Sequence, residues 1–187
     1  MSDELQGKLR TVRVNFAGAM MASCLMRRVS ATELKKAAGR LIIGEDGFYC
    51  VGHDAKVPDD AGDYYEINIG GSTTARDRAA MELAKMALRN MTSDTYEAVY
   101  DYCESHGQLP SMQVQDWYQF ARVIRNSLTH TQCFKFHSRV LAILPVTWKG
   151  RTIDASMNGL EVPFTFFDWH VGVELFNDIF EFAGTLP

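Results

Sequence analysis

Apolar residues recur at helical spacing along most of the chain, and the clearest case lies in residues 113–130. Apolar side chains at i, i+3, i+4, i+7 and i+11 form one stripe there: Trp117, Phe120, Ala121, Ile124 and Leu128. Arg125, Asn126 and His130 lie off this stripe. The pattern predicts an amphipathic helix that packs one side on a core and carries polar side chains near its end.

Two helices are predicted before this one in the N-terminal part of the chain. Residues 4–26 have the apolar content and spacing of a helix. Ser30 and Glu33 have the spacing of a capping box, so a second, short helix is expected to begin there and to end at Gly39.

Residues 40–71 have a different character. The β-prone runs LIIG, FYCVG and YYEINIGG alternate with turn-rich pieces. We expect an irregular insert with one or two short strands. Tyr64, Tyr65, Ile67 and Ile69 indicate that this insert packs on the body of the protein rather than serving as a linker.

Helical spacing returns after Gly71. Candidate N-caps at Ser72, Thr73 and Thr74, with Asp77 three residues after Thr74, predict a helix that runs through Arg89. Residues 92–94 (Thr-Ser-Asp) are expected to cap a separate helix that stops near residues 106–107. Residues 109–111 are expected to form the turn into the central helix.

The C-terminal part of the chain predicts a small β-hairpin and one more helix. Turn signals in the WKGRT stretch and at Asn158-Gly159 favour the hairpin. Asp168 is expected to cap the last helix, with an apolar stripe of Val171, Leu175, Ile179 and Phe182. The predicted fold is therefore mainly α, with five or six helices, a small β-hairpin and an irregular insert (40–71), in a single domain of residues 1–187.

Composition places the chain among soluble globular proteins. It has 187 residues, of which 47% are hydrophobic and 22% charged, which suffices for a substantial core. The four cysteines form no CxxC pair, which favours reduced thiols in a cytoplasmic protein. The apolar run of residues 16–26 is shorter than the roughly 20 residues of a membrane span, so no membrane partner is expected. The signatures of phosphate-binding loops, zinc proteases and serine hydrolases are absent, and no metal or cofactor is predicted.

Charge is unevenly distributed, although the net charge is only −4. Residues 117–153 contain no Asp or Glu, and they carry six Lys and Arg residues. Beyond Arg151 the chain has acidic residues and no Lys or Arg. Two interpretations stay open: the basic segment binds a polyanion or another subunit, or it packs against the acidic tail.

The stretch from Arg125 to His130, RNSLTH, resembles the motif of the HEPN (higher eukaryotes and prokaryotes nucleotide-binding) family. In that motif four to six residues separate an Arg from a His, and a polar residue, often Asn, follows the Arg. With 12 Arg, 5 His and 6 Asn in 187 residues, chance yields an Arg-x4-His pair about 0.3 times and the triplet with Asn about 0.01 times. The resemblance covers residues 72–187, and it implies a HEPN-like helical bundle.

The resemblance implies a metal-independent endoribonuclease of the kind found among toxin, phage-defence and RNA-processing members. Such proteins act as homodimers in which two motifs meet across the interface, and a toxin is held in check by an antitoxin or other inhibitor protein. The catalytic residues would be Arg125, Asn126 and His130. His130 could relay the proton of the RNA 2′-hydroxyl, Arg125 could stabilise the charge on the phosphate, and Asn126 could orient either of them.

Further residues are candidates for supporting roles. In the family an acidic residue on the preceding helix often supports the site, and Glu97 and Asp101 are the candidates here. The residues expected along the RNA path are Arg122, Lys135, His137 and Arg139.

Helix geometry limits what one motif can do alone. On an ideal helix, positions 125 and 130 lie about 140° apart around the axis and about 7.5 Å apart along it. A local distortion of the helix, or two-fold pairing of two chains, is therefore expected to complete the site. In the alternative interpretation Arg125 pairs with the acidic stretch 94–104, and Asn126 and His130 satisfy backbone groups. The corresponding alternative function is a non-catalytic HEPN-like module that binds nucleotide, RNA or a protein.

Overall fold

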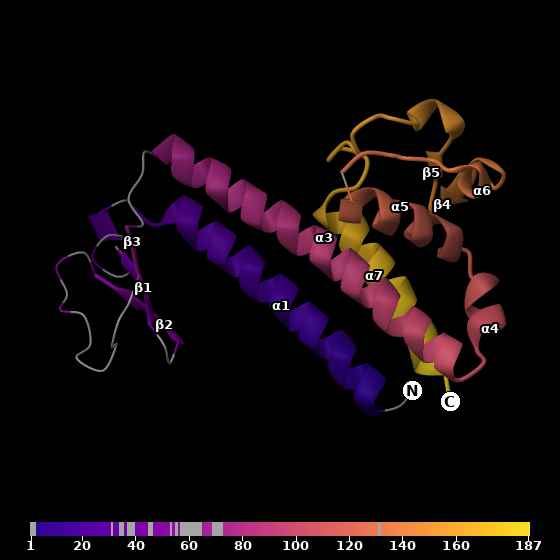
Figure 1. Ribbon diagram of the computed structural model, residues 1–187, viewed down its shortest axis with the longest axis horizontal. Helices are drawn as coiled ribbons and strands as arrows, with labels where there is room; N and C mark the ends of the chain where they lie inside the picture. Colours follow the sequence, from indigo (N-terminus) through magenta and orange to yellow (C-terminus); the bar gives the residue numbers. More distant parts are fainter. Residues whose placement is uncertain are drawn as a thin grey trace. The chain divides into compact units, whose positions relative to one another are not determined.

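The computed structural model places most of the chain in helices, as predicted (Figure 1). It describes residues 3–30, 32–33, 36, 40–44, 47–52, 54, 56, 65–68, 73–130 and 132–187. Contacts divide the chain into two compact units, residues 1–18 with 85–187 and residues 19–84. Helices α1 (Asp3–Arg28) and α3 (Thr73–Ser105) contribute residues to both. The first of these helices was predicted for residues 4–26, and that prediction is confirmed.

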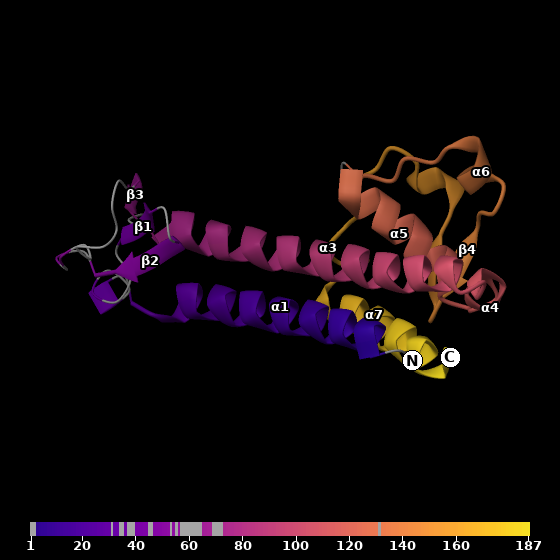
Figure 2. The ribbon, with the colours of Figure 1, turned by 60° about the horizontal axis from the view of Figure 1, so that its bottom comes forward.

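The larger unit contains most of the remaining elements. These are α4 (Leu109–Gln113), α5 (Tyr118–His130), α6 (Ser138–Leu141), β4 (Val146–Trp148), β5 (Arg151–Ile153), the 3-10 turn Ala155–Met157 and α7 (Trp169–Thr185). Figures 1 and 2 show α5 and α7 beside the second half of α3. The core between them is built from apolar side chains of every helix longer than two turns, including Leu9, Val99, Phe120, Ile124, Leu175 and Ile179.

α3 is one continuous helix of 33 residues, so the predicted break between Arg89 and residues 92–94 is wrong. The Thr92 hydroxyl, predicted to cap a new helix, instead donates to the carbonyl of Leu88 one turn earlier at 2.9 Å. Its buried position in the core favours this bond over a cap. The end of α3 agrees with the prediction: Gly107 has φ +67°, and the Gln108 amide donates to the Cys103 carbonyl at 2.7 Å.

The central helix is shorter than predicted. Residues 109–111, predicted as a turn, belong to α4, which has Pro110 in its first turn, and the chain leaves helical geometry before Trp117. α5 then begins at Tyr118, and the amide of Ala121 donates to the Trp117 carbonyl at 2.8 Å. The predicted stripe is confirmed, because Trp117, Phe120, Ala121 and Ile124 are buried and Leu128 is half-buried.

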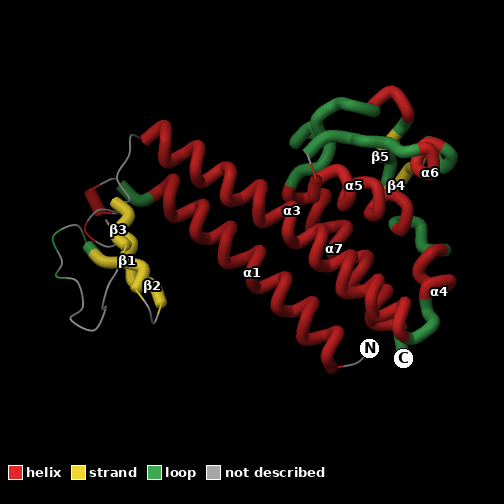
Figure 3. Tube along the Cα trace, in the orientation of Figure 1, coloured by secondary structure: helices red, strands yellow, loops and turns green. Residues whose placement is uncertain are grey.

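The hairpin and the last helix also follow the prediction. β4 and β5, both labelled in Figure 3, are the strands of the hairpin. They pair antiparallel, with Trp148 opposite Arg151. The turn lies at Lys149-Gly150, and not at Asn158-Gly159. Asp168 caps α7 by accepting a hydrogen bond from the Val171 amide at 3.0 Å, and all four residues of the α7 stripe are buried.

The chain that follows α5 is fixed to a later segment. The Val162 amide donates to the Gln132 carbonyl and the Phe134 amide to the Leu160 carbonyl, both at 2.8 Å. Gln132 adopts a positive φ of 56°, which is uncommon for a residue other than glycine. The side-chain oxygen of Asn158 accepts from the Phe136 amide at 2.9 Å, so this asparagine orders a loop instead of a hairpin turn.

The smaller unit contains three strands where an irregular insert with one or two was predicted. β1 (Arg40–Gly44) pairs antiparallel with both β2 (Gly47–Val51) and β3 (Tyr65–Asn68), giving the order β2-β1-β3. Each of the β-prone runs thus forms a strand. Only residues 45–46 separate β1 from β2, whereas the pairing of β1 with β3 could not be inferred because a long turn-rich piece and β2 lie between them in the sequence.

One local signal predicted in this unit is confirmed among the described residues. Ser30 and Glu33 form the predicted capping box: the Glu33 amide donates to Ser30 Oγ and the Ser30 amide to Glu33 Oε2, both at 3.1 Å. Hydrogen bonding to Ser30 lowers the pKa of Glu33. Gly39, Tyr64 and Ile69 lie outside the described residues. Among the helices that the structure describes, none is long and apolar enough to cross a membrane.

Candidate functional site

Arg125 and Glu97 meet where α5 packs beside α3. α5 buries Phe120, Ala121 and Ile124, which leaves Arg125 at the border of the core with 29% of its side chain exposed. α3 buries Val99 in the same core, and its Glu97 side chain is 44% exposed. The two charged groups are thus brought together by helices whose apolar faces fix their orientation.

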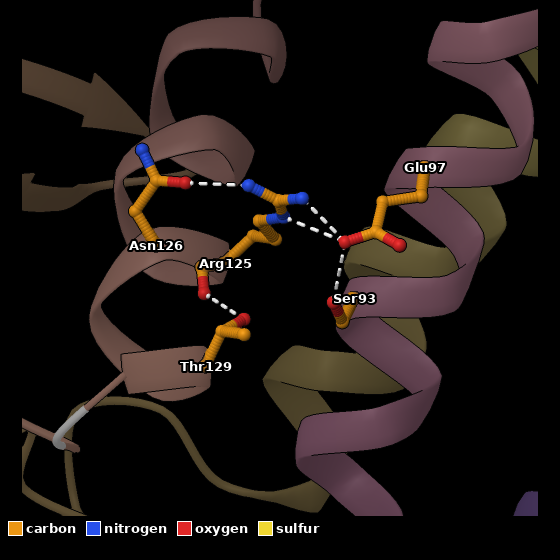
Figure 4. A network of polar contacts seen from close by, with 5 residues as sticks. All are labelled: Ser93, Glu97, Arg125, Asn126 and Thr129. Atoms are coloured by element: carbon orange, nitrogen blue, oxygen red, sulfur yellow. Dashed lines mark hydrogen bonds and ion pairs between the residues drawn. The ribbon is translucent and has the colours of Figure 1, made fainter.

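A short network of polar contacts holds the guanidinium of Arg125 (Figure 4). Arg125 Nε donates to Glu97 Oε1 at 3.1 Å, and Nη2 donates to the same oxygen. Ser93, one turn before Glu97 on α3, donates its hydroxyl to that oxygen at 3.1 Å. On the other side, Arg125 Nη1 donates to Asn126 Oδ1 at 2.8 Å. Arg125 is therefore held between a carboxylate and an amide.

The network leaves N–H donors free for a ligand. A guanidinium has five N–H groups, and three of them serve Glu97 and Asn126. One N–H on Nη1 and one on Nη2 have no partner among the described residues. Figure 4 shows the Asn126 amide nitrogen turned away from Arg125, and it too has no hydrogen bond in the described part of the chain. These donors suit the oxygens of an anion.

Arg125 and Asn126 line a hollow of about 600 Å³, which we call the arginine cleft. Arg122 and Arg139, two of the residues predicted to follow the RNA path, line the same cleft. Arg122 donates to Gln119 at 3.3 Å. Neither residue forms an ion pair within the ranges the structure describes. The other residues at the cleft are Tyr96, Glu97, Tyr100, Asp101, Gln113 and Tyr118.

Tyr96 lies beneath the guanidinium and was not predicted as part of the site. Its ring centre is 6.0 Å from Arg125 Cζ, and it stacks on Tyr118 at 6.2 Å. Burial, and secondarily the neighbouring Tyr118, raise the pKa of Tyr96 far above its usual value. Tyr96 therefore stays a neutral phenol that supports the cation from below. Its spacing on the inward face of α3 marked it only as a core residue.

A second hollow adjoins the first at Asn126, and we call it the His137 hollow. It has a volume of about 420 Å³ and is lined by both Lys135 and His137, the other two residues predicted along the RNA path. Its remaining lining residues are Val123, Asn126, Ser127, Cys133, Phe136 and Val140. All four predicted RNA-path residues thus line a hollow that Asn126 also borders.

The side chain of His130 lies outside the described residues. Its backbone ends α5, which is α-helical without interruption from Tyr118. Thr129 Oγ1 donates to the Arg125 carbonyl at 2.7 Å within that regular helix. The predicted local distortion between positions 125 and 130 is therefore absent from this helix, and two-fold pairing stays a prediction.

Of the two candidate carboxylates, Glu97 contacts Arg125 and Asp101 does not. Asp101 is exposed at the arginine cleft and forms no hydrogen bond or ion pair with any described residue. Two roles were expected for an acidic residue at this place: a carboxylate that supports the catalytic site, or a plain ion pair between Arg125 and residues 94–104. The contact between Arg125 and Glu97 fits both roles. Asn126 Oδ1 accepts from Arg125, and Asn126 has no side-chain bond to a backbone group of the described residues.

The cations of the basic segment, residues 117–153, fall into two groups: some pack against the acidic tail, and others have no acidic partner among the described residues. Lys149 pairs with Asp178 at 2.7 Å, and Arg151 lies 4.0 Å from Glu174, so these two cations pack against the acidic tail. Arg122, Lys135 and Arg139 have no acidic partner in the described ranges. Within this segment, the cations without an acidic partner thus lie at the two hollows.

The described residues contain no group of three or more His, Cys, Asp or Glu side chains able to hold a metal ion. Comparison with known protein families, with curated proteins and with solved structures found no match for this chain.

Proposed function

We propose that the protein is a HEPN-type, metal-independent endoribonuclease that cleaves RNA with Arg125, Asn126 and His130. The observation that carries the proposal is the arrangement of Arg125 at the arginine cleft: Glu97 and Asn126 hold it, while two of its N–H groups have no partner among the described residues. An arginine held in this way is preorganised to bind a phosphate, and preorganised donors stabilise developing charge most effectively.

The reaction that fits these residues is attack of a ribose 2′-hydroxyl on the adjacent phosphorus. His130 accepts the 2′-hydroxyl proton as the bond from O2′ to phosphorus forms. Arg125 and the Asn126 amide bind the non-bridging oxygens, whose negative charge increases in the transition state. The bond from phosphorus to O5′ then breaks, and the products carry a 2′,3′-cyclic phosphate and a 5′-hydroxyl.

The proposal includes a homodimer, because positions 125 and 130 of one regular helix face different directions. Two-fold pairing would place His130 of one chain near Arg125 of the other. It also includes a role as a toxin or phage-defence effector that an inhibitor protein holds in check.

A non-catalytic HEPN-like module is the second candidate, and the contact of Glu97 with Arg125 favours it. The carboxylate offsets the charge of Arg125 before any ligand arrives. Such a module would bind nucleotide, RNA or a protein at the same cleft without cutting. RNA binding would weaken steeply with added salt, because phosphate contacts release counterions, whereas protein binding through polar contacts would weaken less.

The test is RNA cleavage in EDTA by the wild type and by His130→Ala, with analysis of the product ends. We expect the wild type to leave 2′,3′-cyclic phosphates and the folded variant to be inactive. If both proteins leave a broad set of RNAs intact, the binding module replaces the ribonuclease. If both cut equally, the activity does not arise from this site.

A further inference from the structure

We propose that His137 is a second catalytic residue, the general acid that gives a proton to the departing 5′-oxygen of the RNA. This inference rests on the proposed function, because it assigns a role within the same cleavage reaction. It concerns the second proton transfer of the reaction, to O5′, for which Arg125, Asn126 and His130 provide no donor.

The chemistry requires such a donor. When the bond from phosphorus to O5′ breaks, its electron pair stays on O5′, and an alkoxide is a poor leaving group at neutral pH. A positioned acid that protonates O5′ as the bond breaks removes this barrier. His130 has accepted a proton in the first half of the reaction, so a second group must supply this one. Arginine cannot do so, since its guanidinium does not lose a proton in proteins.

The position of His137 suits this role. His137 lines the His137 hollow together with Asn126, whose amide oxygen is bound to Arg125. A phosphate bound at Arg125 and Asn126 would therefore lie at the border of the hollow that His137 lines. Lys135 lines the same hollow and would attract the RNA strand into it.

The backbone of His137 is well fixed, whereas its imidazole is free. The residue before it, Phe136, is buried, and the Phe136 amide is bound by Asn158 at 2.9 Å. The His137 carbonyl accepts the amides of Val140 at 2.9 Å and Leu141 at 3.0 Å. His137 is the N-cap residue of α6, but its side chain is exposed, makes no capping hydrogen bond, and has no other hydrogen bond or ion pair in the described ranges. An imidazole with a fixed backbone and free nitrogens can take a proton from water and give it to a ligand.

Protons and electrons balance in the proposed sequence. The bond from O2′ to phosphorus forms while His130 takes the 2′-hydroxyl proton. The bond from phosphorus to O5′ breaks while protonated His137 gives its proton to O5′. The pair ends with His130 protonated and His137 neutral, and exchange with water restores both before the next turnover.

The test compares two RNA substrates that differ in one atom. In the second substrate sulfur replaces the 5′-bridging oxygen at the cleavage site, and the resulting thiolate leaves without being protonated. The variant is His137→Asn, because asparagine is a good residue for the N-cap position of α6 and does not titrate near neutral pH. His170→Asn, at an exposed histidine of α7, is the matched control.

We expect His137→Asn to slow cleavage of the all-oxygen RNA on the order of 10² to 10⁴-fold and to slow the sulfur substrate by about threefold or less. His130→Ala should be slow on both substrates, since its missing step precedes departure of the leaving group, and His170→Asn should match the wild type. Equal slowing of both substrates by His137→Asn would mean a binding or structural role and would overturn the inference, as would no slowing of either. In both cases the ribonuclease itself would stand. If the wild type cuts neither substrate, the proposed function fails and the role of His137 fails with it.

Discussion

Glu97 binds Arg125 through a single carboxylate oxygen, Oε1, and its Oε2 has no hydrogen bond with any described residue. The same Oε1 also accepts the hydroxyl of Ser93. Arg125 is thus oriented by one oxygen of a carboxylate while the other stays available at the arginine cleft. If Glu97 supports catalysis, removal of its carboxylate should slow RNA cleavage. If Glu97 only forms an ion pair with Arg125, removal of its carboxylate should not slow cleavage.

We predict that Glu97→Ala lowers RNA cleavage about tenfold or more while it changes the free energy of unfolding by less than about 1 kcal/mol, because partly exposed ion pairs stabilise a fold only slightly. Glu97→Gln keeps an oxygen acceptor for Arg125 and should retain more activity than Glu97→Ala. Single-turnover cleavage and urea unfolding measure the two effects. Glu104→Gln is the control, since Glu104 is exposed on the same helix and does not line the arginine cleft. Undiminished or faster cleavage by Glu97→Ala would show that Glu97 only neutralises Arg125.

The unpaired arginines should contribute to RNA affinity through their charge. We predict that Arg139→Ala weakens binding of single-stranded RNA and reduces the slope of log K against log salt concentration by about 0.7, the value for one phosphate contact. Arg122→Ala should behave alike. Lys149→Ala is the control, because Asp178 already pairs with Lys149. Fluorescence anisotropy at several salt concentrations gives the slopes, and slopes equal to that of the wild type would remove these arginines from the RNA path.

Gly172 on α7 lies against the side chains of Leu88 and Met91 of α3. A Cβ at this position would be 2.2 Å from Leu88 Cδ1. We predict that Gly172→Ala lowers the free energy of unfolding by about 1–3 kcal/mol, as overpacking of a core does. Gly184→Ala in the same helix meets no atom within 4 Å and should leave stability unchanged or slightly higher. Equal stability of the two variants in urea unfolding would mean that the Leu88 side chain moves aside without cost.

Asp178 joins the hairpin to α7 through two bonds. Its Oδ2 accepts the Trp148 indole N–H at 3.0 Å, and its Oδ1 accepts Lys149 Nζ at 2.7 Å. We predict that Asp178→Ala lowers stability by about 1–3 kcal/mol, because the N–H of a buried indole loses its acceptor. Asp178→Asn keeps an acceptor and should lose less. Thermal unfolding measures both, and a larger loss for Asn than for Ala would show that the charge of Lys149 dominates.

Thiol reactivity should follow burial. Burial raises the pKa of the Cys103 thiol to about 11. At pH 8 only about one thousandth of this thiol is the reactive thiolate, so Cys103 should stay unmodified by iodoacetamide in the folded protein. Exposed Cys24 should react readily. Mass spectrometry of the labelled peptides checks both. As pH rises toward 11, labelling of Cys103 should increase, and fast labelling of Cys103 at pH 8 would contradict its burial.

Elements with local signals could be predicted from the sequence. The stripe and the Asp168 cap of α7 lie within one segment, and so do the stripe of α5 and the capping box at Ser30. The break before α5 was missed, because the helical stripe continues back through Trp117, which is buried without being part of the helix.

Non-local contacts could not be predicted in the same way. Whether Thr92 caps a helix or bonds back into one depends on burial of that hydroxyl by other elements. The pairing of β1 with β3 is also a non-local contact, because the two strands lie far apart in the sequence. Within the site, sequence placed Arg125 and Asn126 side by side and named Glu97 as one of two candidates. Only packing of α5 on α3, 28 residues apart at this contact, distinguishes Glu97 from Asp101.

The chain is anchored on both sides of α5, and this limits which mutations the stretch from Arg125 to His130 can accept. Before α5, Trp117 is buried in the core, and beyond it the Gln132 carbonyl is bound by Val162. Insertion or deletion of one residue within α5 would rotate every later side chain by about 100°. The fixed ends leave no slack to absorb such a register slip, so point substitutions are the route by which this site can vary.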